Sequence, residues 1–293
     1  MGSVADKIAK KLAVGFGLRA ADLESYWEGL EMALEAGFGD DAPVLDGFEH
    51  LDPCHAPYTF AQNVASFMAE SISVMREAES YCRIFSKAED EYLPAGPPMS
   101  PLTPSYFMMW AMFDVRFGSS RETIGSCVLH ILSGVESPAW LIGVIERMQQ
   151  SRMGFFVHCG SDGENVLLRE VGTRETLSCL VPAGYIGNEG EIWFVRVLPP
   201  PSPLLRHHLV FNTPYVFLDH PEFVFVDYLE RELARMMAGK RRLRTDDPRG
   251  HLMKYGPTPN HWNEYLFCAY LNHLNEVIFV TGIPDMPETL PHA

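Results

Sequence analysis

The spacing of the apolar residues changes near Met153, and this change constrains the fold more than any other feature of the chain. Before it, apolar side chains recur at steps of three and four residues, which is the period of an amphipathic helix. After it, short apolar and aromatic runs are separated by glycine-rich turns, as in antiparallel strands. The sequence therefore predicts an α+β fold: a helical N-terminal region, a small antiparallel β module, and C-terminal helices with a late strand.

The strongest helical pattern covers residues 59–90, where Thr59 is placed to cap the first turn. Apolar residues along this stretch form one stripe, with polar residues largely on the opposite side. The stripe comprises Phe60, Val64, Phe67, Met68, Ile72, Met75, Ala78, Cys82 and Phe85. Other helices must cover such a stripe, so we expect a bundle helix here.

Several further helices are expected. Thr103-Pro104 and Ser137-Pro138 each combine a capping residue with proline at the first helical position, which marks a helix start. The proline-rich segment 94–101 cannot be helical and is interpreted as a stiff connector. The expected helices cover residues 4–14, 21–36, 104–117, 121–133, 138–150, 221–238 and 259–274.

Residues 152–218 are expected to form five short strands with tight turns, which is typical of a small barrel or a strongly curled sheet. The late strand at 276–281 needs a partner, and we expect it to pair with this β module. The predicted organisation is a helical region at 1–151, the β module at 152–218, and a C-terminal segment at 219–293. We expect that last segment to pack on the β module in one integrated unit.

Charge and cysteine content limit the partners and the cellular compartment that we expect for this protein. Lys and Arg number 23 against 38 Asp and Glu, and the resulting charge of −15 argues against a nucleic-acid partner. No apolar run has the length of a membrane span. The six cysteines are scattered without a C-x-x-C pair, so free thiols in a reducing cytoplasm are expected. The sequence does not identify a cofactor.

Common catalytic motifs are missing from the sequence: G-x-S-x-G, H-E-x-x-H and G-x-x-x-x-G-K-[ST] do not occur. Residues 15–20 fit G-x-G-x-x-A, but a dinucleotide site needs a buried strand before it, so a turn between helices is the better interpretation. The basic residues at 240–244 are interpreted as cations at a helix C-terminus, with binding to phosphate or an acidic partner as the alternative.

One polar loop contains a candidate metal site. His50, Asp52, Cys54 and His55 supply the imidazole, carboxylate and thiolate groups that bind zinc or iron. Their spacing matches no familiar ligand pattern, and Asp52 is equally suited to a turn or a helix cap. The loop is therefore compatible with a metal site and with an ordinary turn into a helix.

The β module contains a candidate binding surface of aromatic and basic residues: Tyr185, Trp193, Arg196 and Tyr215. Successive side chains of a strand point to opposite faces, so Trp193 and Phe194 cannot both face inward. We expect one of the two to be exposed or covered by another element.

These observations favour a non-enzymatic cytoplasmic protein that binds or regulates a protein or small-molecule partner. The alternative is a metal-dependent hydrolase, or another enzyme, that uses His50, Asp52, Cys54 and His55, together with His158 or His208.

Overall fold

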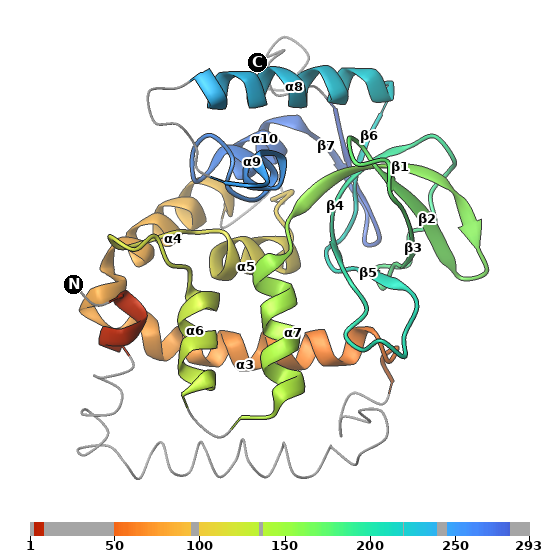
Figure 1. Ribbon diagram of the computed structural model, residues 1–293. Helices are drawn as coiled ribbons and strands as arrows, with labels where there is room; N and C mark the ends of the chain where they lie inside the picture. Colours follow the sequence, from red (N-terminus) through yellow and green to blue (C-terminus); the bar gives the residue numbers. More distant parts are fainter. Residues whose placement is uncertain are drawn as a thin grey trace. The chain divides into compact units, whose positions relative to one another are not determined.

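The computed structural model describes residues 3–8, 50–94, 100–134, 137–218, 220–238 and 245–281 (Figure 1). The chain divides into two compact units that alternate along the sequence. We call Met1–Arg83, Arg116–Gln149 and Pro201–Leu205 the helical unit, and Ile84–Val115, Gln150–Pro200 and Arg206–Ala293 the barrel unit. The helix predicted at 21–36, the glycine motif at 15–20 and the basic residues at 240–244 lie outside the described residues.

Helices occupy most of the positions expected for them in the described residues. They are α3 (His55–Ser73), α4 (Glu79–Tyr92), α5 (Pro104–Phe113), α6 (Ile124–Ser133), α7 (Ala139–Gln150), α8 (Glu222–Ala238), α9 (Pro248–Tyr255) and α10 (His261–Ala269). The strands are β1 (Met153–Asp162), β2 (Asn165–Glu170), β3 (Thr176–Leu180), β4 (Ile192–Leu198), β5 (His208–Val210), β6 (Tyr215–Phe217), β7 (Tyr270–His273) and β8 (Ile278–Val280). Among the helices described, none combines the length and apolar character needed to cross a membrane.

The single helix predicted at 59–90 is wrong, because the chain forms two helices, α3 and α4, with a 3-10 turn between them. Helix α3 ends at Ser73 with Val74 as its C-cap, and Met75 adopts an extended conformation with φ −86° and ψ 141°. Apolar spacing of three and four residues fits two consecutive helices as well as one, so the period did not reveal the break. Phe67 is also misplaced by the prediction: it is 42% exposed, whereas Ile72 is fully buried.

The helix predicted at 259–274 also needs correction. Helix α10 ends at Ala269, and the next residues form β7, which pairs antiparallel with β8. Residues 270–273 thus form a hairpin with β8, and β8 itself pairs with β6 of the distant β module, so the surrounding sheet outweighs the local helix propensity.

Five strands close into a barrel in the order β1-β2-β3-β5-β4, because β4 also pairs with β1 (Figure 1). Strands β6, β8 and β7 continue the sheet outward from β4. The pairings are antiparallel except β3–β5 and β6–β8. The expectation that the late strand joins the β module is confirmed by the pairing of Tyr215 with Ile278, and the predicted α+β class is confirmed with it.

The aromatic side chains of β1 and β4 are divided between the two faces of the barrel wall. Phe156 lies opposite Trp193, and both belong to the apolar cluster of the barrel interior. Phe155 lies opposite Phe194 on the other face, where the ring of Trp262 from α10 packs 5.1 Å from that of Phe194. Trp193 and Phe194 are therefore both buried, one inside the barrel and one beneath a helix, and the interior is a packed core.

The helical unit is built around α3, which runs across α6 and α7 (Figure 1). Phe60 of α3 packs on Trp140 of α7 with ring centroids 5.7 Å apart. A capping box formed by Thr123 and Ser126 starts α6. Residues 4–8 form a helical turn, and Glu122 accepts hydrogen bonds from the backbone amides of Val4 and Ala5 at 2.6 and 3.1 Å.

The end of α3 allows a matched test of this packing. Ile72→Asp places a charge among buried side chains and should lower the free energy of unfolding by more than about 3 kcal/mol. Val74 is 85% exposed, so Val74→Asp should change it by about 0.5 kcal/mol or less. Urea titration of the two variants measures both values, and equal losses would contradict the assignment of the buried face.

Candidate functional site

The candidate metal ligands lie at the start of α3, where Asp52 orders the turn into the helix. The backbone carbonyl of Asp52 accepts hydrogen bonds from the amides of His55 and Ala56 at 2.8 and 3.0 Å. Its carboxylate accepts another from the amide of Cys54 at 2.7 Å. These contacts satisfy amides at the amino end of the helix, which otherwise lack partners.

The protonation states at this turn follow from burial. Burial, followed by the nearby Asp52 carboxylate, raises the pKa of Cys54 to about 12, so its side chain is a neutral thiol at pH 7. Burial also lowers the pKa of His55, while the neighbouring Asp52 opposes that shift. His50 is exposed. Metals bind the thiolate of cysteine, so a metal at this turn would first have to displace the proton of a buried thiol.

The four candidate binding residues do not form a shared surface. Trp193, Arg196 and Tyr215 are almost entirely buried, and Tyr185 is half-buried. Tyr185 and Trp193 do lie together, with ring centroids 5.4 Å apart. Both donate to the carboxylate of Glu191, Tyr185 through its hydroxyl at 3.1 Å and Trp193 through its indole nitrogen at 2.9 Å. This contact closes the glycine-rich loop between β3 and β4.

His158, part of the alternative enzyme hypothesis, is also held inside the barrel unit. Its Nδ1 accepts a hydrogen bond from the amide of Gly160 at 3.2 Å. Its Nε2 therefore carries the proton and donates to the carbonyl of Ile186 at 2.8 Å. With both ring nitrogens engaged and the side chain buried, His158 fixes the same loop. His208 lies in β5 and is half-buried.

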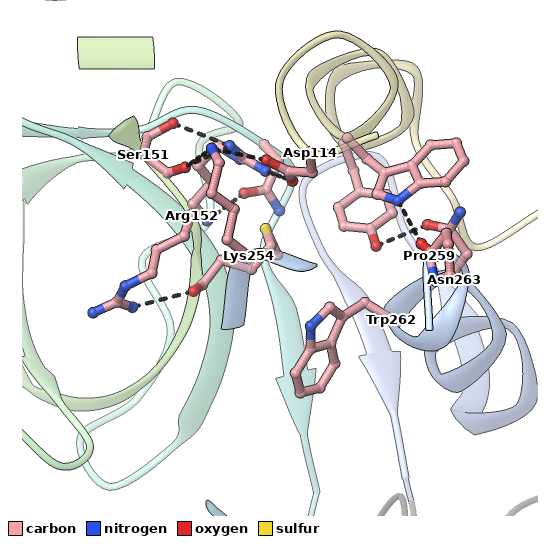
Figure 2. Close-up of polar contacts among 12 residues, drawn as sticks. Asp114, Ser151, Arg152, Lys254, Pro259, Trp262 and Asn263 are labelled. Atoms are coloured by element: carbon pink, nitrogen blue, oxygen red, sulfur yellow. Dashed lines mark hydrogen bonds and ion pairs between the residues drawn. The ribbon is translucent and has the colours of Figure 1, made fainter. Parts of the chain in front are cut away.

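Arg196 instead belongs to a buried charge network of the barrel unit, formed with Asp114 and Lys254. Asp114 caps the end of α5 and forms ion pairs with Arg196 of β4 and, at 3.0 Å, with Lys254 of α9. Both cations also donate to the carbonyl of Ser151, Arg196 at 3.1 Å and Lys254 at 2.7 Å (Figure 2). A helix end, a strand and a second helix are thereby joined at one carboxylate.

The network contains two cations and one carboxylate, so it is not electrically balanced. Burial, and secondarily the charge of Arg196, lowers the pKa of Lys254 to about 8, although Asp114 acts in the opposite direction. A second set of contacts between α5 and the C-terminal region lies beside it: Tyr106 donates to Asn263 and Trp110 donates to the carbonyl of Pro259, each at 3.0 Å (Figure 2). Because its charged groups are buried, this network serves to hold the fold.

One open site within the described residues of the barrel unit is a groove of about 460 Å³. Its lining residues are Arg169, Arg174, Glu222, Phe223 and Val226. Two hydrogen bonds of 2.8 Å join the guanidinium of Arg169 to the two carboxylate oxygens of Glu222. These bonds lower the pKa of Glu222 and raise that of Arg169. Phe223 is 64% exposed.

Arg174 is the other cation of the groove. It lies in the turn between β2 and β3, where its amide donates to the carbonyl of Glu170 at 3.0 Å. Its φ of 62° is in the left-handed region, which favours glycine and is uncommon for arginine. Within the described part of the chain, its guanidinium forms no hydrogen bond or ion pair.

Sequence reasoning missed this groove because its residues come from a strand, a turn and a helix. One sequence feature of α8 could have indicated the groove. The buried residues of α8 include Phe225, Tyr228 and Leu229, which recur at helical spacing, and Phe223 lies off that stripe. An aromatic residue outside the buried stripe of a helix marks an exposed apolar position.

Comparison of the chain with protein-family models, with curated proteins and with solved structures finds no match.

The imbalance of the charge network predicts different costs for removing its two kinds of charge. Asp114→Asn leaves two buried cations without a counter-ion and should lower the free energy of unfolding by about 3–5 kcal/mol. Lys254→Met leaves the Asp114–Arg196 pair intact. It removes the hydrogen bond to Ser151 and the ion pair with Asp114, but it also removes a cation whose burial is unfavourable, so it should cost only about 1 kcal/mol. Chemical denaturation at pH 7 measures both, and an equal or larger cost for Lys254→Met would contradict the imbalance.

The difference in unfolding free energy between the unaltered protein and Lys254→Met should depend on pH. The pKa of Lys254 is about 8 when folded and 10.5 in its ordinary state, so between these values the unfolded chain binds one proton more. Stability relative to Lys254→Met should therefore rise with pH across this interval.

Proposed function

We propose that this protein is a non-enzymatic binding protein of the cytoplasm that takes a small molecule in the groove between the β2–β3 turn and the first turns of α8. The exposed ring of Phe223 carries the proposal, because it lies in a concave site with Val226 beside it. The volume of about 460 Å³ lies within the range of small-molecule sites, which is about 300–1,000 Å³.

The groove residues favour binding over catalysis. Glu222 is the acidic group of the lining, and both of its carboxylate oxygens accept hydrogen bonds from Arg169. Its lowered pKa keeps it ionised, so it is poorly suited to act as a general acid. The cytoplasmic location is supported by the cysteines, all six of which are free thiols.

The alternative proposal is a metal-dependent hydrolase at His50, Asp52, Cys54 and His55. It has less support, because Cys54 is a buried, protonated thiol and Asp52 already orders the start of α3. Metal analysis of protein purified without added metal separates the two proposals, since stoichiometric zinc or iron would favour the enzyme.

The groove is tested by saturation-transfer NMR with a panel of small aryl and alkyl compounds that includes neutral, anionic and cationic members. At least one chemical class should bind the protein, and Phe223→Ser should weaken that binding by about tenfold or more, since a buried aromatic contact contributes more than 1.4 kcal/mol.

Phe67→Ser is the matched control, because Phe67 is also an exposed phenylalanine of a helix but lies in α3 of the helical unit. It should leave binding unchanged. The proposal fails if no compound of the panel binds, or if the two serine variants affect binding equally.

A further inference from the structure

We propose that the ligand of the groove is a small amphipathic monoanion, a carboxylate on an apolar arm, and that Arg174 binds the carboxylate. The inference rests on the proposed function and adds the chemistry of the ligand to it.

The lining of the groove contains two cations and one carboxylate. Arg169 and Glu222 neutralise each other through a bidentate pair, and Arg174 has no such partner within the described residues. The α8 side of the groove is formed by the first turns of a 17-residue helix, and the amino end of a helix carries partial positive charge. In a chain of net charge −15, this groove is complementary to a single negative charge.

A carboxylate fits this site better than a phosphate. The planar guanidinium of arginine binds a carboxylate through two parallel hydrogen bonds. One guanidinium balances the charge of a monoanion, whereas a dianion would keep an uncompensated charge near the ionised Glu222. Phe223 and Val226 supply the apolar contact for the rest of the molecule.

Neither the backbone nor the packing of the turn requires arginine at position 174. Its φ of 62° suits glycine better, and its side chain is exposed. The guanidinium acts on the groove through its charge, which contributes to the lowered pKa of Glu222. Among the described residues this cation has no hydrogen-bond or ion-pair partner, and its backbone conformation is unfavourable for arginine, so it is assigned to ligand binding.

Calorimetric titration of the full chain with 3-phenylpropanoate and octanoate, each compared with its neutral amide, tests this assignment. The carboxylates should bind about tenfold or more tightly than the amides, since hydrogen bonds to charged groups contribute about that factor. Arg174→Gly should abolish the preference without lowering the melting temperature, because glycine suits the backbone there. Phenyl phosphate should bind more weakly than 3-phenylpropanoate.

Arg121→Gly is the matched control, because Arg121 also has a positive φ, 55°, but lies in the helical unit; it should keep the preference. The inference is overturned if amides bind as tightly as carboxylates, if Arg174→Gly retains the preference, or if phenyl phosphate binds best. Amide binding that still depends on Phe223 would contradict this inference but agree with the proposed function. If no probe binds, both the inference and the proposed function are contradicted.

Discussion

The barrel unit depends on the buried carboxylate of Asp114, which joins three segments that are distant in sequence. It ends α5, pairs with Arg196 in the barrel wall and pairs with Lys254 of α9. A buried ion pair seldom adds net stability over apolar packing, because desolvation of the charges offsets their attraction. The network instead favours one arrangement of the three segments, because any arrangement that separated them would leave buried charges without partners.

Aromatic side chains pack the C-terminal helices against the strands that the charge network joins. The outer face of β1 and β4 presents Phe155 and Phe194, and Trp262 of α10 covers both, with ring centroids 5.9 and 5.1 Å away. Phe225 of α8 packs on Phe155 at 4.9 Å. Because α8 is anchored in this way, its first turns are held beside β2, where the Arg169–Glu222 pair forms one side of the groove.

The features predicted correctly from the sequence are those encoded locally. Capping residues with proline at 103–104 mark the start of α5, and short apolar and aromatic runs between glycine-rich turns mark the strands. The break between α3 and α4 and the strand β7 were missed, because apolar spacing does not distinguish one helix from two, and the hairpin of β7 with β8 is fixed by the sheet that β8 joins through β6. Arg196 was predicted to be a binding residue, but it is buried with Asp114, which lies 82 residues away in the sequence. The groove was missed for the same reason.

Native-state hydrogen exchange tests most directly whether Asp114 holds the three segments together. The probes are the amides of Asp114, Arg196 and Gly256, which donate to Trp110, Asn212 and Leu252 respectively. The account predicts that all three exchange with one common opening free energy, and that Asp114→Asn lowers the three values together. Faster exchange at Asp114 alone, with Arg196 and Gly256 unchanged, would contradict it.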